Sequence, residues 1–189
     1  MAQRMAGTRG LVLGKFMPPH KGHIHLIETA ARQVDELTVM VCSIKKEPIP
    51  GASRYAWMKA LFPNSRVIHV TDENPQFPEE HRFFWKIWVN TIQRNCPNGL
   101  DYFFSSELYG DELARHLNIE HIMVDLERKT VPISASKIRK NPYQNWEFIP
   151  EVVRPFYLKR VVLTGPESVG KSVLSKKLAV HFNTSFVEE

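Results

Sequence analysis

Residues 14–23 read Gly14-Lys15-Phe16-Met17-Pro18-Pro19-His20-Lys21-Gly22-His23. An apolar run at 11–13 precedes them, and apolar residues at helical spacing follow them. This order predicts a strand, a tight loop and a helix, with two histidines where the helix begins. The first N–H groups of a helix lack intrahelical partners and lie at the positive end of its dipole, so the loop is a natural phosphate site.

The residue types in this loop suit phosphate chemistry. Gly22 lets the backbone approach a ligand closely, and two imidazoles three positions apart can both donate hydrogen bonds to one phosphate. Lys15 adds a cation at the end of the strand. A pair of histidines alone would be read as ordinary loop residues. The functional interpretation is favoured because glycines, prolines and both histidines fall together at a strand–helix junction.

The loop resembles the GxFxPxHxGH motif of the nucleotidyltransferase α/β-phosphodiesterase superfamily, whose members join a nucleoside triphosphate to an acceptor phosphate and release pyrophosphate. Class I aminoacyl-tRNA synthetases carry a related HxGH. A second marker, Ile-Ser-Ala-Ser-Lys-Ile-Arg at 133–139, is similar to the ISxTxxR motif of the adenylyltransferases. Ser136 replaces the usual threonine there and keeps the hydroxyl, so we expect little functional change.

The resemblance implies a role for each matching residue. His20 and His23 are expected to contact the triphosphate and to stabilise the transition state. Lys15 and Arg139 are expected to steady the β- and γ-phosphates together with Mg²⁺. The other ATP-binding candidates in the two motifs are Gly14, Phe16, Gly22, Ser134 and Ser136. The two serines open a predicted helix, where hydroxyls would otherwise be read as capping groups.

The composition bounds the class of protein. With 189 residues, 43% of them hydrophobic and 24% charged, the chain is suited to one globular domain or a domain and a fragment. A net charge of +5 suits phosphate-bearing ligands but is too small and too scattered to predict a nucleic-acid surface. No apolar run approaches the length of a membrane span. Cys42 and Cys96 lack metal-site spacing, and Cys42 lies in an apolar run, as a buried free thiol does, which favours a reducing, cytoplasmic compartment.

Four more apolar segments are typical of buried strands, and helical patterns separate them. They lie at 37–43, 67–70, 101–105 and 121–124. Helices are predicted from a Ser53 cap to Leu61, over 79–95, over 112–117 and from Ile149 onward. Strands that alternate with helices predict a doubly wound, parallel, Rossmann-like α/β sheet of five strands. One nucleotidyltransferase domain over residues 8–157 accounts for it.

Two further ligand contacts are predicted outside the motifs. Arg54 falls in the first turn of a helix, where a cation works against the helix dipole. In this superfamily an arginine that opens the helix after the second strand commonly meets triphosphate, which favours ATP binding over a plain surface role. The aromatic helix at 79–95 should mainly pack in the core. The run Ile87-Trp88-Val89 is similar to enzymes acting on nicotinamide mononucleotide (NMN), which implies that Trp88 stacks on the pyridine ring.

A second phosphate motif begins at Gly165. Residues 165–172 match GxxxxGK[ST], with a predicted strand at 159–164 before them, an amphipathic helix after them and a further strand at 185–187. The fixed positions are Gly165, Gly170, Lys171 and Ser172. In such a P-loop the backbone N–H groups wrap phosphate, the lysine reaches the β- and γ-phosphates, and the serine ligates Mg²⁺. Residues 158–189 are therefore predicted to be the first βαβ unit of a P-loop kinase domain, and we expect no kinase activity from this chain alone.

The order of the motifs is similar to that of the NadR-type bifunctional enzymes, which couple NMN adenylyltransferase to ribosylnicotinamide kinase. The resemblance implies adenylyl transfer from ATP to NMN, giving NAD and pyrophosphate with Mg²⁺. Three alternatives stay open: an adenylyl- or cytidylyltransferase with another acceptor such as phosphopantetheine, a synthetase, and a non-catalytic sensor of ATP or NAD. An aromatic surface could also form a homo-oligomer interface. Neither nucleic acid nor membrane is an expected partner.

Overall fold

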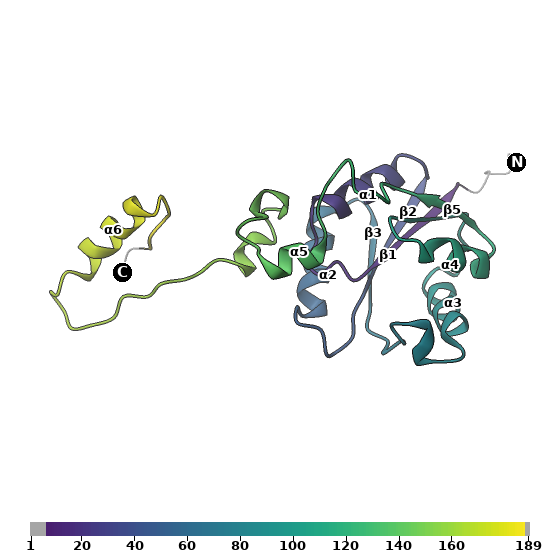
Figure 1. Cartoon of the computed structure of the whole chain (residues 1–189), viewed down its shortest axis with the longest axis horizontal. Helices are drawn as coiled ribbons and strands as arrows, with labels where there is room; N and C mark the ends of the chain where they lie inside the picture. Colours follow the sequence, from purple (N-terminus) through teal and green to yellow (C-terminus); the bar gives the residue numbers. More distant parts are fainter. Residues whose placement is uncertain (1–6, 188–189) are drawn as a thin grey trace, which may run out of the picture. The chain divides into compact units, whose positions relative to one another are not determined.

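Five strands form one parallel sheet in a computed structural model of the chain, which describes residues 7–187 (Figure 1). The strands are β1 (Arg9–Gly14), β2 (Glu36–Cys42), β3 (Arg66–Val70), β4 (Tyr102–Ser105) and β5 (Glu120–Met123). Their order across the sheet is β3-β2-β1-β4-β5, so β1 is central and pairs with both β2 and β4. The predicted doubly wound parallel α/β sheet is confirmed.

Helices connect successive strands, as parallel pairing requires. The connecting helices are α1 (Lys21–Ala31), α2 (Gly51–Leu61), α3 (Phe84–Asn95) and α4 (Tyr109–Leu117). After the last strand, β5, come α5 (Ala135–Lys140) and α6 (Lys171–His181). Short 3₁₀ turns lie at Pro78–Glu80, Trp146–Phe148 and Arg154–Phe156. No helix within residues 7–187 is long and apolar enough to cross a membrane.

The core lies on both faces of the sheet because successive strand residues point to opposite sides. Val12 belongs to a cluster that includes Ile27 of α1 and Met58 of α2, whereas its neighbour Leu11 packs with Ile92 of α3 and the buried residues of α4. All of these named side chains are fully buried. The helices α1 and α2 therefore cover one face of the sheet, and α3 and α4 cover the other (Figure 1).

Several predicted helices differ from the structure. α4 begins at Tyr109, before the predicted start at residue 112. α2 begins at Gly51 with Pro50 as its N-cap, so Ser53 lies inside the helix and is not its cap. The helix predicted over 79–95 is broken, because His81 is extended between a 3₁₀ turn and α3. The helix predicted from Ile149 forms only turns and the 3₁₀ segment Arg154–Phe156. Pro150 and Pro155 lie between Ile149 and Phe156, and proline has no N–H for helical hydrogen bonding.

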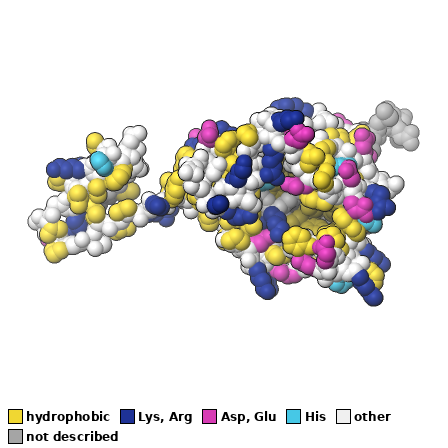
Figure 2. All heavy atoms as spheres, viewed as in Figure 1, with side chains coloured by type: hydrophobic (Ala, Val, Ile, Leu, Met, Phe, Trp, Pro, Cys, Tyr) yellow, Lys and Arg dark blue, Asp and Glu magenta, His cyan; other side chains and the backbone are white. Residues whose placement is uncertain are grey.

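A second unit begins at Leu158, where contacts within the chain divide it from the preceding residues. The one helix among its described residues is α6, as predicted, but residues 159–164 and 185–187 form no strands. A strand needs a neighbour for its hydrogen bonds, and none of the described strands pairs with these segments. Val161 and Val162 are accordingly 80% and 79% exposed, and Figure 2 shows many apolar side chains on this unit. The predicted βαβ unit is therefore wrong for the described residues; residues 188 and 189 of the predicted kinase fragment lie outside them.

Candidate active site

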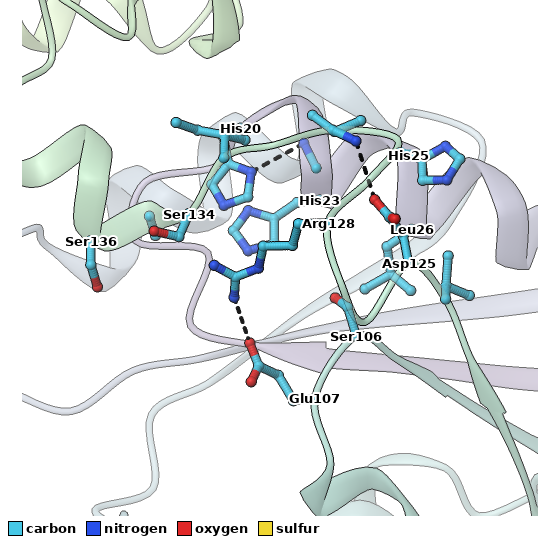
Figure 3. A pocket seen from close by; sticks show the side chains of 15 residues that line it. His20, His23, His25, Leu26, Ser106, Glu107, Asp125, Arg128, Ser134 and Ser136 are labelled. Atoms are coloured by element: carbon cyan, nitrogen blue, oxygen red, sulfur yellow. Dashed lines mark hydrogen bonds and ion pairs between the residues drawn. The ribbon is translucent and has the colours of Figure 1, made fainter.

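A cavity of about 270 Å³ opens at the carboxyl ends of the central strands (Figure 3). After β3 the chain returns to the other side of β1, so the strand order reverses between β1 and β4. Open α/β sheets bind ligands at this position. The lining residues are His20, Gly22, His23, His25, Leu26, Ser106, Glu107, Val124, Asp125, Arg128, Val131, Ile133, Ser134, Ala135 and Ser136.

His20 is the N-cap of α1, where its Nδ1 accepts a hydrogen bond of 3.1 Å from the backbone N–H of Gly22. An imidazole that accepts at Nδ1 and is neutral carries its proton on Nε2, so Nε2 is a donor. Gly22 has no side chain to disturb this arrangement. A Cβ there would meet Cε1 and Nδ1 of His20 at 3.0 Å.

The two motif histidines stack face to face. The ring centroids of His20 and His23 are 3.7 Å apart, and Phe16 meets His23 edge-on at 5.0 Å. Burial, with a smaller contribution from the positive charge of Arg128, lowers the pKa of His20 to about 4. Burial, then His20 and Arg128, lower the pKa of His23 well below its usual value. Both rings are therefore neutral near pH 7 and act as hydrogen-bonding groups rather than as cations.

The second motif closes the opposite side of the cavity. Ser134 is the N-cap of α5 and accepts a hydrogen bond of 3.3 Å from the N–H of Lys137, and both Ser134 and Ser136 line the cavity. Arg139 donates to the hydroxyl of Ser136 at 3.1 Å and to the carbonyl oxygen of Met17. Arg139 therefore ties α5 to the histidine loop, although its side chain is not part of the cavity lining.

Lys15 and Arg54 share one partner outside the cavity lining. The Glu47 carboxylate lies 3.0 Å from Nζ of Lys15 and forms an ion pair with Arg54, which is fully buried. Arg54 also donates to the carbonyl oxygens of Lys15 and, at 3.2 Å, Cys42. Burial alone would raise the pKa of Glu47, but the N–H of Ile44 and the two cations hold it below its usual value. The predicted contacts of Lys15 and Arg54 with ATP stay predictions.

Three other predicted residues also lie outside the cavity lining. Gly14 is the last residue of β1, and a Cβ there would reach the Phe16 ring at 3.4 Å. Phe16 itself is 2% exposed, has a left-handed φ of 46°, and meets the His23 ring edge-on. Trp88 packs against the second core cluster and donates from Nε1 to the carbonyl oxygen of Pro75 at 2.9 Å. Its stacking on a pyridine ring stays a prediction.

Charged residues of two loops belong to the cavity but were not singled out from the sequence. Arg128, in the loop after β5, donates to Glu107 at 3.0 Å, and Glu107 belongs to the turn after β4. Asp125 accepts from the N–H groups of Thr130 at 3.1 Å and Val131 at 3.2 Å. The charged run at 125–129 belongs to no motif. The one signal in the sequence that it lies near the site is its place directly after a predicted strand.

The P-loop motif is folded as a loop and helix start within the second unit. Gly165 and Gly170 have φ of 154° and 85°, which glycine adopts readily, and α6 begins at Lys171. The Lys171 ammonium donates to the carbonyl oxygens of Gly165 at 3.1 Å and Pro166 at 2.9 Å. Ser172 follows in the first turn of α6. Among residues 7–187, no three His, Cys, Asp or Glu side chains are grouped to hold a metal ion.

The sheet order, the paired histidines at its switch point and the opposed serines define a nucleotidyltransferase-type α/β domain. Residues 11–141 match the cytidylyltransferase-like family model, which is more than half of the chain, and the chain belongs to this family. It is 34% identical over 200 residues to the trifunctional NAD biosynthesis/regulator protein NadR of Escherichia coli (strain K12), a match covering 96% of this chain and 48% of that protein.

Further relatives point the same way. The nicotinamide-nucleotide adenylyltransferase of Thermococcus onnurineus (strain NA1) is 29% identical over 156 residues, covering 78% of this chain and 81% of that enzyme. A crystal structure of NadR protein in complex with NR superposes with a TM-score of 0.78 at 26% identity, covering 96% of this chain and 54% of that one. The resemblance to NadR-type proteins is thus confirmed. The chain spans about half the length of the NadR proteins it matches.

Proposed function

We propose that this chain transfers the adenylyl group of ATP to the 5′-phosphate of NMN, giving NAD and pyrophosphate. The observation that carries the proposal is the neutral His20–His23 stack, which faces Ser134 and Ser136 across one cavity. The similarity to nicotinamide-nucleotide adenylyltransferases and to a NadR structure in complex with NAD and AMP-PNP supports the choice of substrates.

In the proposed reaction a phosphate oxygen of NMN attacks the α-phosphorus of ATP in line. A new P–O bond forms as the bond between the α- and β-phosphates breaks, and pyrophosphate leaves with the electron pair. No side-chain nucleophile is needed, so the protein contributes positioning and hydrogen bonds to the developing charge. The Nε2–H of His20 is a preorganised donor for this purpose, because its Nδ1 is already occupied by the Gly22 N–H.

Mg²⁺ is the proposed metal of the reaction. It usually keeps several waters and binds through substrate phosphates with one or two protein oxygens, so a cluster of protein ligands is not required. When bound, it neutralises phosphate charge. In the P-loop, Ser172 would hold it, as the residue type and position fit that role.

The remaining predicted residues have supporting roles in this proposal. Lys15 and Arg139 steady the β- and γ-phosphates, Arg54 binds ATP, and Trp88 stacks on the pyridine ring. Lys15 and Arg54 would have to exchange Glu47 for a phosphate to do so, because Glu47 is their partner in this structure. The cytoplasmic location and a homo-oligomer stay predictions.

The second unit is proposed to be the opening of a ribosylnicotinamide kinase domain. The support is the P-loop motif at residues 165–172 and the similarity of this chain to NadR. We expect no phosphorylation of nicotinamide riboside by the 189-residue chain alone. Measurable phosphorylation by the purified chain would contradict this expectation.

The experiment is to incubate the purified chain with ATP, Mg²⁺ and NMN and to quantify NAD and pyrophosphate by chromatography. The deamidated mononucleotide is run in parallel, and His23→Asn is the inactive control. We expect the parent chain to form NAD and pyrophosphate in equal amounts, and His23→Asn to form neither at a comparable rate. ATP binding without product would instead favour a sensor or a different acceptor phosphate.

A further inference from the structure

The cavity has an unexpected charge balance for a site that takes a polyanion. Among its described lining residues, Arg128 is a cation, whereas Glu107 and Asp125 are carboxylates. The stacked histidines add no positive charge near pH 7, because burial holds their pKa values low. A triphosphate entering this cavity therefore meets two negative side chains and one positive one. The two carboxylates differ in the contacts that they make.

The Asp125 carboxylate is hydrogen-bonded to the backbone of its own loop. Its two carboxylate oxygens accept from the N–H groups of Thr130 and Val131, at 3.1 Å and 3.2 Å. Asp125 and Arg128 both have left-handed backbone angles, with φ of 50° and 53°, which side-chain-bearing residues adopt only when the surroundings enforce them. The Asp125 clamp thus fixes the loop and with it the place from which Arg128 extends.

The backbone of Glu107 is held by hydrogen bonds, but among the described residues its carboxylate makes only a solvent-exposed ion pair. The hydroxyl of Ser105 donates to the Glu107 carbonyl at 3.0 Å, and Ser105 is held by His121 at 2.9 Å, which in turn meets Asp111 at 2.6 Å. The Glu107 carboxylate, in contrast, makes one ion pair, with Arg128 at 3.0 Å. The side chains of that pair are 55% and 42% exposed, and ion pairs of this kind contribute little and exchange readily.

Arg128 is directed toward the motif histidines. Figure 3 shows its guanidinium beside His23, with the dashed line to Glu107 on the other side. A planar guanidinium binds carboxylate and phosphate through the same paired N–H geometry. Glu107 accepts one hydrogen bond, from Nη2 of Arg128, and a phosphate oxygen can accept from the same N–H group.

We propose that Glu107 is a displaceable counter-ion, which holds Arg128 beside the histidines until a nucleotide phosphate takes its place. This inference rests on the proposed function for the identity of the ligand. Substitution of a residue that lines a binding cavity usually weakens binding. Here, removal of the Glu107 charge is predicted to strengthen ATP binding, because the phosphate no longer competes with the carboxylate for Arg128. If Glu107 only positioned Arg128, the same substitution would weaken binding.

The test is calorimetric titration of the full chain with MgATP and no acceptor, in a Lys171→Ala background that removes ATP binding at the P-loop. Glu107→Gln is expected to lower the Kd about threefold to fivefold, the range for an exposed charge pair. Glu127→Gln is the matched control, since Glu127 lies in the same loop as Arg128 but is outside the cavity lining and 66% exposed. It should change the Kd less than about twofold.

A double-mutant cycle separates exchange from general repulsion of phosphate by Glu107. Arg128→Gln is expected to raise the Kd about tenfold or more, the range for hydrogen bonds to charged groups. In that background, Glu107→Gln should no longer strengthen binding. Three outcomes would each overturn the proposal. Glu107→Gln could leave ATP binding unchanged or weaker, Glu107→Gln could still strengthen ATP binding in the Arg128→Gln background, or the parent chain could fail to bind ATP. NAD formation is measured separately, so the proposed reaction and this exchange can fail independently.

Discussion

His20 and His23 present their rings to one cavity as a stacked pair, with centroids 3.7 Å apart and planes inclined by 24°. Two imidazolium ions this close would repel each other, so at least one ring must be neutral, and burial keeps both neutral near pH 7. The stack also makes the two side chains depend on each other for position, and Phe16 supports His23 on its edge.

In the proposed reaction, replacement of His23 should affect turnover far more than affinity. His23→Asn is expected to lower kcat for NAD formation by about 100-fold or more, the range for loss of one preorganised donor to a developing charge. The KM for ATP should change less than about threefold, because the lost interaction belongs to the transition state. Steady-state kinetics measure both. His116→Asn on α4, outside the cavity lining, is the control. Equal effects on kcat and affinity would argue against this role.

The stability of the fold should fall at mildly acidic pH. The pKa of His20 is about 4 in the folded chain and 6.5 for an ordinary histidine. Between these values the unfolded chain binds a proton at His20 that the folded chain does not. The free energy of unfolding therefore decreases as the pH is lowered through this window, by up to about 3 kcal/mol from this group. Urea unfolding at successive pH values measures the decrease.

His20→Asn should make this part of the pH profile less steep, because the substituted side chain does not titrate, while His23, whose pKa is also lowered by burial, keeps its own contribution. His81→Asn is the matched control, since His81 is exposed and outside the cavity lining, and its profile should follow that of the parent chain. A parent chain whose stability is level over the same window would show that His20 is not buried and neutral in solution.

The buried ion pair of Glu47 and Arg54 should be critical for stability. Arg54 is fully buried, and the Glu47 side chain is 6% exposed. Glu47→Ala leaves the guanidinium without a carboxylate partner and is expected to lower the free energy of unfolding by about 3–5 kcal/mol. Glu73→Ala is the control, because Glu73 is exposed and accepts one hydrogen bond from Lys45 of the same loop as Glu47. A loss below about 1 kcal/mol would mean that the pair is open in solution and that Arg54 is free to meet phosphate.

Much of the fold could be predicted because its determinants are local. Alternating apolar and helical segments specify a parallel sheet, and the loop at 14–23 places both histidines at the start of α1. The predicted strand at 159–164 failed for a non-local reason, since no described strand pairs with it. The break at His81 was also hidden, because the helical pattern of 79–95 continues through a residue whose backbone is extended.

The residues of the candidate site that belong to sequence motifs could be predicted. Those that are far apart in the sequence and are brought together by the fold were harder to predict. Arg128 and Glu107 are distant in the sequence and become neighbours because β4 and β5 end at the same edge of the sheet. Arg54 illustrates the opposite case. Its place at the start of a helix suggested a ligand, but the partner that occupies it, Glu47, could not be assigned from spacing alone.

Gly22 offers a test that separates site geometry from stability. Alanine usually stabilises a helix relative to glycine by about 0.5–1 kcal/mol. At this position, however, the added Cβ would lie 3.0 Å from two ring atoms of His20, so the ring must shift by a few tenths of an ångström. Such a displacement of a positioned donor is expected to lower kcat about tenfold, while the melting temperature stays level or rises. Lys21→Ala, in the same turn and exposed, is the matched control and should alter neither by much. Full activity in Gly22→Ala would show that the His20 ring need not be held where the structure places it.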